Sequence, residues 1–190
     1  MQVSLVSSNE SCPLDGITIK AIADFIEDHG GKEAFEGKTT TDVNNLIQKP
    51  LTQELKVSYC KYLKIKKKST IKEANVFISH AWQYQFLDVV EAITEHFNND
   101  DDTYIWFDVF TVNQHTNITN SEWWAESFRS AIEKIGRTVV VLSPWNSPIP
   151  FTRAWCLWEI YCTIVSGKKL EFAMCSKEKQ AFFEWHHPGA

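Results

Sequence analysis

Two side chains in the segment 155–159 (WCLWE) have the clearest chemical use in the chain. On a helix, residues four positions apart project from one face, so Trp155 and Glu159 are expected side by side. A carboxylate next to an indole could hold a ribose hydroxyl and stabilise positive charge that develops at the C1 carbon of the sugar. The alternative is a surface glutamate beside a core tryptophan, and the spacing alone favours this alternative.

Polar and aromatic residues gather immediately after three predicted strands. The segments are 79–82, 108–115 and 143–159. Parallel sheets bind ligands beyond the carboxyl ends of their strands, in the crevice where the strand order reverses. We therefore expect a ligand site at the edge of the sheet where these three segments meet.

The elements that must position these segments alternate along the second part of the chain. Short apolar runs rich in β-branched and aromatic residues, typical of buried strands, alternate with amphipathic segments of helical periodicity. The expected strands are 75–80, 103–108, 138–143 and 169–174, and the expected helices are 86–97, 123–135, 152–165 and 177–185. This alternation predicts βαβ units and a parallel α/β sheet with right-handed crossovers.

The first part of the chain has a different periodicity. Residues 17–63 carry apolar side chains three to four positions apart, which predicts three short helices. The first is expected to stop at Gly30, the second to start near Thr41 and to end before Pro50, and the third to cover 51–63. A lysine-rich linker at 64–68 follows. We expect residues 1–70 to form a small N-terminal helical module and residues 71–190 to form the α/β domain.

The composition is that of a globular protein. The 190 residues suffice for one good-sized domain or for a domain with an appendage, and 44% of them are apolar and 23% charged, which excludes a disordered or fibrous chain. Eight Trp and twelve Phe predict a core rich in aromatic rings. The net charge of −5 comes from residues 73–190, and the lack of a basic stripe argues against nucleic acid as a principal partner.

The cysteines and the hydropathy pattern indicate a cellular compartment. Five cysteines are scattered without a C-x-x-C pair, so we expect reduced thiols in a cytoplasmic protein and neither a disulfide framework nor a metal site. No apolar run approaches the roughly 20 residues that span a bilayer, so no membrane span is expected. Neither a dinucleotide fingerprint nor a P-loop is present.

Three blocks of sequence, in order, resemble a Toll/interleukin-1 receptor (TIR) domain. The blocks are NVFISHAW (75–82), a strand ending in Phe107 and Asp108, and AIEKIGRTVVVLSPW with TRAWCLWEI (131–145 and 152–160). They are similar to the first strand of that family, to the second strand with the aspartate that opens the long BB loop, and to the V-V-V-x-S-P strand with its W-C-x-x-E helix. The match covers about residues 73–174 and implies a flavodoxin-like parallel sheet.

The resemblance implies one of two activities. Some TIR domains are scaffolds that only self-associate, and others cleave NAD⁺ at the nicotinamide–ribose bond to give ADP-ribose or a cyclic product. The enzymatic members depend on a glutamate four positions beyond a tryptophan on the helix after the third strand, and Glu159 with Trp155 matches that arrangement. Glu159 is therefore the expected catalytic residue and Trp155 a wall of the pocket. NAD⁺ enters as substrate, and no cofactor is implied.

Further contacts to the substrate are expected from the strand ends. His80 could be a general base or a hydrogen-bonded structural histidine, Asp108 could hydrogen-bond the loop that follows it, and Arg153 could bind phosphate or form a surface ion pair. Trp123 and Trp124 could stack on adenine or belong to the core, and their place at the start of a helix favours the core. The expected substrate-binding residues are Ser79, His80, Ala81, Trp82, Asp108, Ser143, Trp145, Arg153 and Trp155, and the expected self-association loop contains Asn113, Gln114 and His115.

The chain departs from the TIR pattern in three places. One is the loop 111–121, which lacks the glycine and proline that the family often has there and that bear on its self-assembly role. Only four parallel strands are visible where the family has five in the order 2-1-3-4-5, and Ala81 and Trp82 stand where many family enzymes carry Arg or a small polar residue. We expect an NAD⁺ glycohydrolase, with or without ADP-ribosyl cyclase activity, that acts in immune or cell-death signalling as a homo-oligomer, with other TIR or signalling proteins as further partners. The alternatives are a non-catalytic adaptor that assembles through TIR contacts and a sensor that binds a nucleotide without cleaving it.

Overall fold

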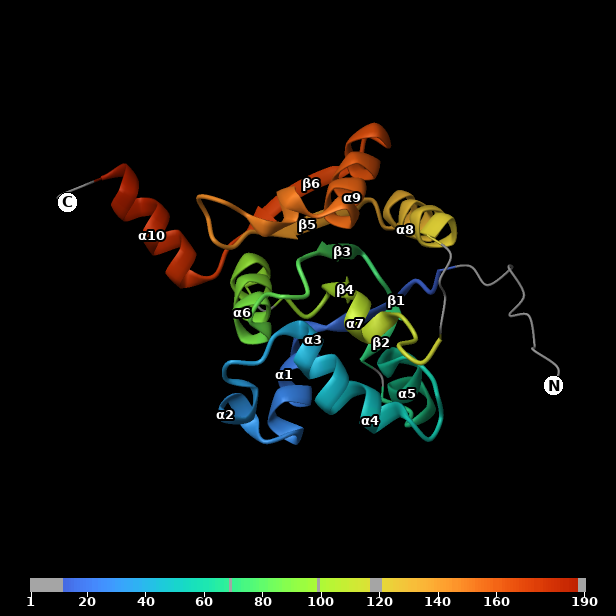
Figure 1. Ribbon diagram of the computed structural model, residues 1–190. Helices are drawn as coiled ribbons and strands as arrows, with labels where there is room; N and C mark the ends of the chain where they lie inside the picture. The colour runs from blue at the N-terminus through green and yellow to red at the C-terminus, as the bar shows by residue number, and fades with distance from the viewer. Residues whose placement is uncertain (1–11, 69, 99, 117–120, 188–190) are drawn as a thin grey trace.

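A mixed six-stranded sheet forms the centre of the protein (Figure 1). The computed structural model describes residues 12–68, 70–98, 100–116 and 121–187. The strand order is β2-β1-β4-β3-β5-β6. The strands are β1 (Asp15–Thr18), β2 (Ile71–Glu73), β3 (Val76–Ser79), β4 (Tyr104–Trp106), β5 (Arg137–Val141) and β6 (Lys169–Ala173).

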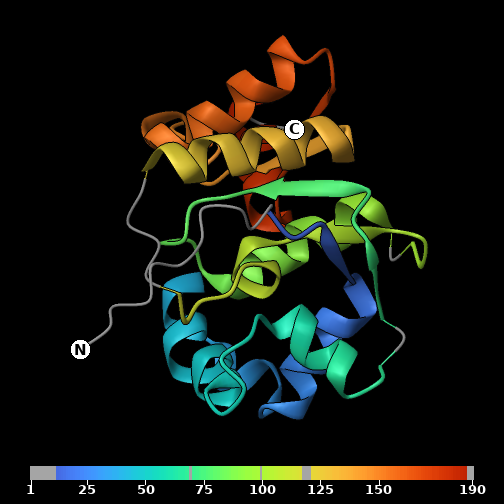
Figure 2. The ribbon, with the colours of Figure 1, turned by 90° about the vertical axis from the view of Figure 1, so that its right-hand side faces the viewer.

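Four of the strands, β4-β3-β5-β6, are parallel and confirm the predicted α/β class. Their connections contain α6 (Phe86–Phe97), α8 (Ser121–Ile135) and α9 (Ala154–Val165). Figure 2 shows α8 and α9 on one face of the sheet and the N-terminal helices on the other. The short helix α7 (Asp108–Thr111) follows β4, and the short helix η2 (Ile149–Thr152) precedes α9. The order of these four strands reverses at β3, as the crevice rule requires.

The two remaining strands were not predicted. β1 pairs antiparallel with both β4 and β2, so the chain before residue 75 adds two strands to the sheet, and the expected helical segment from Ile17 begins as a strand. Gly16 makes this pairing possible, because a Cβ atom there would lie 2.8 Å from the Cα of Ala74 and 2.9 Å from Tyr104. Ile17, paired with Ile105, is fully buried.

The N-terminal helices are α1 (Ile19–Asp28), α2 (Gly31–Phe35), α3 (Thr40–Val43), η1 (Asn44–Gln48), α4 (Lys49–Thr52) and α5 (Tyr59–Ile65). The first predicted helix is confirmed, with the hydroxyl of Thr18 as its N-cap. The predicted end of the second helix and the predicted start of the third helix were wrong. Pro50 lies in the first turn of α4, where its missing N–H is tolerated, so the second helical segment continues past it. The third begins only at Tyr59, because Ser58 caps it.

Aromatic side chains fill the core on both faces of the sheet, as predicted. On the face of the N-terminal helices, Phe25 packs edge-to-face against Phe35 and Phe110, with ring centroids 5.7 and 5.1 Å apart. On the opposite face, the rings of Phe77 and Trp106 stack at 4.4 Å. Residues of α1 and of β3 belong to one continuous apolar cluster, so the N-terminal helices and the sheet share a core.

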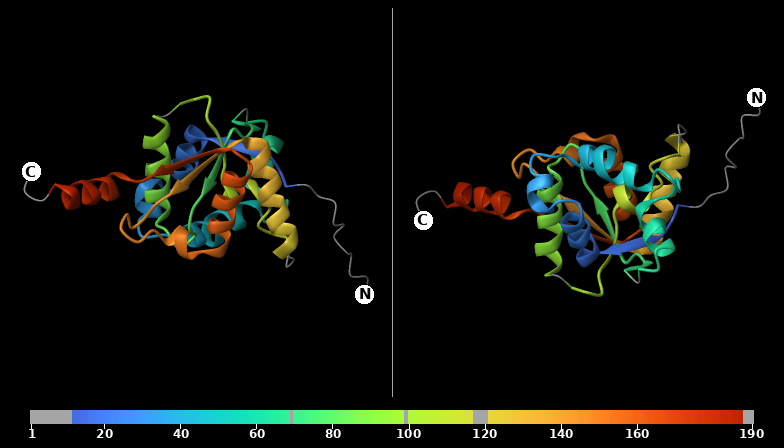
Figure 3. Two further views of the ribbon diagram at one scale, coloured as in Figure 1. Left: turned by 90° about the horizontal axis from the view of Figure 1, so that it is seen from above. Right: turned by 90° about the horizontal axis from the view of Figure 1, so that it is seen from below.

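The chain continues after β6 into α10 (Ser176–His186), near the expected bounds. This helix extends away from the rest of the molecule in Figure 1 and in both views of Figure 3. Among the described residues β6 is the last strand, so no fifth parallel strand lies beside it there. All five cysteines are free thiols, and no helix in the described part of the chain combines the length and apolarity that a membrane crossing demands.

Candidate functional site

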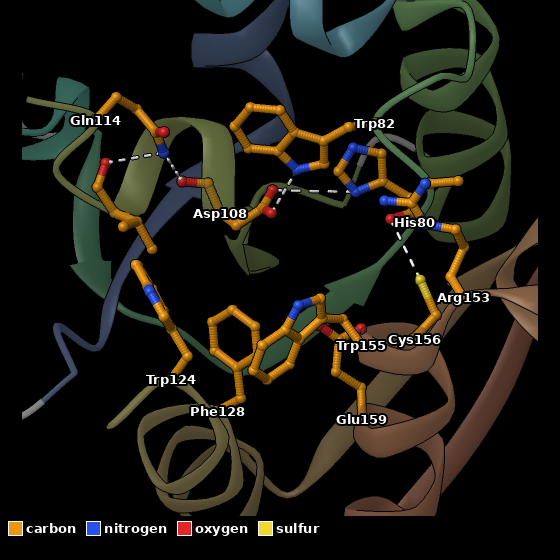
Figure 4. Close-up of a pocket in the computed structure, with 12 residues that line it drawn as sticks. His80, Trp82, Asp108, Gln114, Trp124, Phe128, Arg153, Trp155, Cys156 and Glu159 are labelled. Carbon is orange, nitrogen blue, oxygen red and sulfur yellow. Dashed lines mark hydrogen bonds and ion pairs between the residues drawn. The ribbon is translucent and has the colours of Figure 1, made fainter. Parts of the chain in front are cut away.

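A cavity of about 300 Å³ lies at the carboxyl ends of β3 and β4, and α8 and α9 form its opposite wall (Figure 4). This is the crevice that the order of the parallel strands predicts. The lining residues are His80, Ala81, Trp82, Asp108, Val112, Gln114, Trp124, Phe128, Arg153, Trp155, Cys156 and Glu159. Eight of these lining residues were expected at the site from the sequence. They are Glu159 and His80, Ala81, Trp82, Asp108, Gln114, Arg153 and Trp155.

Glu159 contributes a buried carboxyl group to this cavity. It lies in the second turn of α9, is 8% exposed, and accepts a hydrogen bond from the hydroxyl of Ser79. Within the described ranges no Lys, Arg or His forms an ion pair with it. Burial raises the pKa of Glu159 to about 8; the Ser79 hydrogen bond opposes this shift and the charge of Asp108 adds to it. The side chain is therefore mostly protonated at neutral pH.

Aromatic rings form the wall beside Glu159. The Trp155 ring lies 5.9 Å from that of Phe128 in a near-perpendicular arrangement, and Phe128 in turn contacts Trp124 at 5.5 Å. Figure 4 shows these three rings on the side of the cavity opposite Trp82 and Asp108. Trp155 is 40% exposed, so its ring is accessible to a ligand. Such a wall suits a flat cationic ring, which is attracted to aromatic faces.

His80 lies behind the cavity with its ring almost fully buried. Its Nε2 atom is 3.2 Å from the Thr40 hydroxyl, and its Nδ1 atom is 4.0 Å from Asp108 Oδ1. Burial lowers the pKa of His80 to about 3, so the imidazole is neutral at physiological pH and a weak base. These contacts favour the structural alternative for His80 over a general base.

Asp108 provides the second carboxyl group of the cavity. Its Oδ2 atom accepts a 2.6 Å hydrogen bond from the indole N–H of Trp82, and its Oδ1 atom accepts one of 2.8 Å from the backbone N–H of Val109. Burial raises the pKa of Asp108 to about 6, and these two hydrogen bonds oppose the shift. The carboxyl thus fixes Trp82 in the wall, and it is the more acidic of the two carboxyl groups.

Arg153 is the cation at the mouth of the cavity. It precedes α9, is exposed, and its Nη1 atom lies 3.4 Å from the amide oxygen of Gln83. In the part of the chain that the structure describes, it forms no ion pair with a carboxylate. A guanidinium in this position is available to a phosphate group.

The expected self-association loop packs against the protein's own N-terminal helices. The Asn113 amide donates to the backbone oxygen of Lys56 at 2.9 Å, and His115 Nε2 lies 2.8 Å from the Thr52 hydroxyl. Gln114 turns the other way, donates to the backbone oxygen of Asp108 at 3.1 Å, and lines the cavity. Two of the three loop residues therefore hold the loop in place, and one contributes to the site.

Ser143 and Trp145 were expected at the site, but the structure places them elsewhere. The Ser143 hydroxyl and the Trp145 backbone N–H each donate at 2.8 Å to the buried carboxylate of Glu178, on α10. The Trp145 ring packs against Phe182 and Trp185 of the same helix. These residues fasten α10 to the body and do not line the cavity.

Four lining residues were missing from the expected set: Val112, Trp124, Phe128 and Cys156. Of the two tryptophans expected either to stack on adenine or to belong to the core, Trp124 lines the cavity beside Phe128. Trp123 is not among the lining residues, and its ring contacts that of Trp124 at 4.9 Å. The Cys156 thiol donates to the backbone oxygen of His80 at 3.6 Å, and burial raises its pKa to about 12, which makes it a packed thiol and no nucleophile at neutral pH. The helical spacing of Trp124 and Phe128, four residues apart, is the signal that could have identified them together.

No group of three potential metal ligands occurs in the described ranges. Comparison of the chain with protein-family models, with curated proteins and with solved structures finds no match. The chemistry of the cavity is therefore the basis on which a function can be assigned.

Proposed function

We propose that the protein is a TIR-type NAD⁺ glycohydrolase that cleaves the nicotinamide–ribose bond with Glu159 as its catalytic residue. The observation that carries the proposal is a buried carboxyl group, with no cationic partner among the described residues, at a cavity walled by aromatic rings. Burial without a partner is costly for a carboxylate, and such strongly perturbed acids concentrate at functional sites. The site also lies in the crevice where parallel sheets bind ligands.

The reaction suits a single carboxylate. The pyridinium ring of NAD⁺ is positively charged and leaves as neutral nicotinamide, so the leaving group needs no acid. Bond breaking creates an oxocarbenium-like cation at the ribose C1 carbon, which a nearby carboxylate stabilises electrostatically. Water then adds to C1, its proton is released to solvent, and ADP-ribose results. In a cyclase reaction, a nitrogen of the adenine ring takes the place of water.

The raised pKa of Glu159 couples substrate binding to ionisation. A cationic ring in the cavity favours the charged form of the carboxyl and lowers its pKa, because opposite charges stabilise one another at short range. The proton of Glu159 is then lost as the substrate settles, and the carboxylate is created next to the ribose. Ser79, which donates a hydrogen bond to Glu159, keeps the carboxyl oriented during this change.

The size of the cavity determines which half of the substrate enters it. A volume of about 300 Å³ is at the lower end of the range for ligand pockets, so it suits the nicotinamide–ribose half. Trp155 lies against the ring, and Arg153 at the mouth binds the first phosphate. The adenosine half extends to the surface, where a neighbouring copy of the chain completes the binding site. The activity thereby depends on self-association and serves immune or cell-death signalling in the cytoplasm.

A nicotinamide-release assay tests this proposal. Purified protein is incubated with NAD⁺ at several protein concentrations, beside Glu159→Gln and the matched surface control Glu36→Gln. Glu36 lies at the exposed end of α2 and undergoes the same chemical change far from the cavity. We expect turnover by the wild type and by the control, a rate per molecule that rises with concentration, and a loss of at least 100-fold in Glu159→Gln.

Calorimetric titration with NAD⁺ and with ADP-ribose distinguishes the alternatives. Equal turnover by the wild type and Glu159→Gln would refute the role of Glu159. Binding of NAD⁺ without release of nicotinamide would replace the enzyme with a nucleotide sensor. A protein that neither binds nor cleaves NAD⁺ but self-associates would be an adaptor.

A further inference from the structure

One side of α9 is exposed and apolar although it belongs to a helix in the body of the protein. The one charged residue of this helix, Glu159, is buried on the opposite side, so the exposed side carries no charge at all. Leu157 and Ile164 lie two turns apart on the same side and are 44% and 61% exposed. A helix that is apolar all round is normally covered on every side, and this one is not.

The edge of the sheet extends this apolar surface. β6 is paired only with β5 among the described residues, and its outer edge is free. Phe172 of β6 lies in register with Val140, on the face of the sheet that α9 covers, and its ring contacts that of Phe151 at 6.4 Å. We call Phe151, Leu157, Tyr161, Ile164 and Phe172 the edge surface.

The second exposed apolar group of the chain lies on α10. Phe182, Phe183 and Trp185 are 41%, 57% and 65% exposed on a helix that points away from the body (Figure 3). The start of this helix is firmly held, because Lys179 pairs with Glu95 at 2.5 Å and Glu178 accepts hydrogen bonds from Ser143 and Trp145. α10 is thus presented in a fixed direction. Phe182 and Trp185 contact the Trp145 ring on one side, and all three aromatic side chains of α10 remain partly open to solvent.

From these two surfaces we infer that the chain forms a reciprocal dimer in which α10 of each copy covers the edge surface of the other. Trp185 lies on nearly the opposite side of α10 from Phe183, because they are two positions apart on the helix, so it is left out of the contact. The other seven side chains expose about 700 Å² per copy, at about 200 Å² for a complete large side chain. Both contacts together then bury about 1,400 Å², within the range of standard stable interfaces. The five side chains of the edge surface carry no charge, which fits the centre of such an interface, and Arg129, Glu133 and Lys168, which line a hollow with Tyr161, lie at its rim.

A second copy fits better than an unrelated partner because each chain carries both halves of the contact. Two identical contacts related by a two-fold axis close the assembly, so both apolar surfaces are covered and no further copy can add through them. The dimer leaves the cavity open, since Glu159 and Cys156 lie on the other side of α9. This inference does not depend on the proposed activity.

Light scattering after gel filtration tests the dimer with three variants of the full chain. Ile164→Glu alters the edge surface, Phe183→Glu alters α10, and Leu46→Glu is the matched control, because Leu46 is 62% exposed on η1, outside both surfaces. We expect the wild type and the control to be dimers at 50 µM and the other two variants to be monomers with wild-type circular dichroism. A monomeric wild type, or a dimer that survives Phe183→Glu, would overturn the inference.

Mixing the two monomeric variants gives the decisive result. In a mixture, the intact α10 of Ile164→Glu can still bind the intact edge surface of Phe183→Glu, so one of the two contacts is restored. We expect a heterodimer in the mixture and none in either variant alone. The single restored contact buries half the area of the full dimer, so the mixture is measured up to the highest soluble concentration. A mixture that associates no more than either variant alone would mean that α10 and the edge surface do not meet, and oligomers that grow beyond a dimer would exclude a closed assembly.

Discussion

Glu159→Gln should make the protein more stable, and the gain should grow as the pH rises. Burial holds the pKa of Glu159 at about 8 in the folded protein, against an ordinary value of 4.5. The folded state therefore binds the proton more tightly than the unfolded state does, and ionisation destabilises the fold as the pH rises from 4.5 to 8. A pKa difference of one unit corresponds to about 1.4 kcal/mol, so the wild type should lose about 3 to 4 kcal/mol relative to Gln between pH 5 and 8.

Urea denaturation of both proteins at half-unit steps from pH 5 to 9 measures this difference. Gln is nearly isosteric and keeps an oxygen that can accept the hydrogen bond from Ser79, so packing should change little, and all other titrating groups cancel in the difference. The free energy of unfolding of Glu159→Gln minus that of the wild type should rise steadily and level off above pH 8. A difference that is flat, or that falls with pH, would show that the carboxyl is not held protonated by burial, and our account of its coupling to a cationic substrate would fail.

Three other predictions follow from the same structure. kcat/KM for NAD⁺ should rise tenfold per pH unit up to about 8 and then level off, because Glu159 must be ionised; a profile flat from pH 6 to 8 would contradict this. Trp82→Phe removes the indole donor and should raise the pKa of Asp108 above 6 in a carboxyl NMR titration, whereas an unchanged value would exclude the hydrogen bond. Gln48→Met should increase the free energy of unfolding by about 1–2 kcal/mol, because both amide atoms of Gln48 are buried without a hydrogen-bond partner among the described residues. A decrease in the free energy of unfolding would show that the Gln48 amide does have a hydrogen-bond partner.

The parallel part of the sheet was predictable because its signals are local. Apolar β-branched runs separated by amphipathic helices identify β3, β5 and β6 within one or two residues, and α6 has the predicted bounds. β1 was not predicted because it has only four residues and forms a strand through its pairing with β2 and β4. Ile17 pairs with Ile71 and Ile105, which lie 54 and 88 positions further along the chain. Pairing over such distances leaves no periodic trace in a segment this short.

The candidate site was predictable where one helix or one strand end carries it. Trp155 and Glu159 share a turn of α9, and Asp108 follows β4, so a local pattern suffices for them. Trp124 and Phe128 reach the cavity only because α8 packs against α9, where the Trp158 indole donates to the backbone oxygen of Ala125 at 3.0 Å. The angle between two helices depends on all the side chains at their contact, and no short motif encodes it.

The misplacement of Ser143 and Trp145 shows where the strand-end rule stops being sufficient. The rule places the chain after β5 at the correct edge of the sheet, but it does not fix which way the chain turns there. The carboxylate of Glu178, 35 residues further on, is buried and accepts hydrogen bonds from both residues, so the turn leads towards α10 and away from the cavity. A buried carboxyl group requires donors, and satisfying Glu178 uses the two residues that the sequence analysis expected at the site. Among the described residues, the strand-end polar groups of the cavity therefore follow β3 and β4, and neither Ser143 nor Trp145 contributes to its lining.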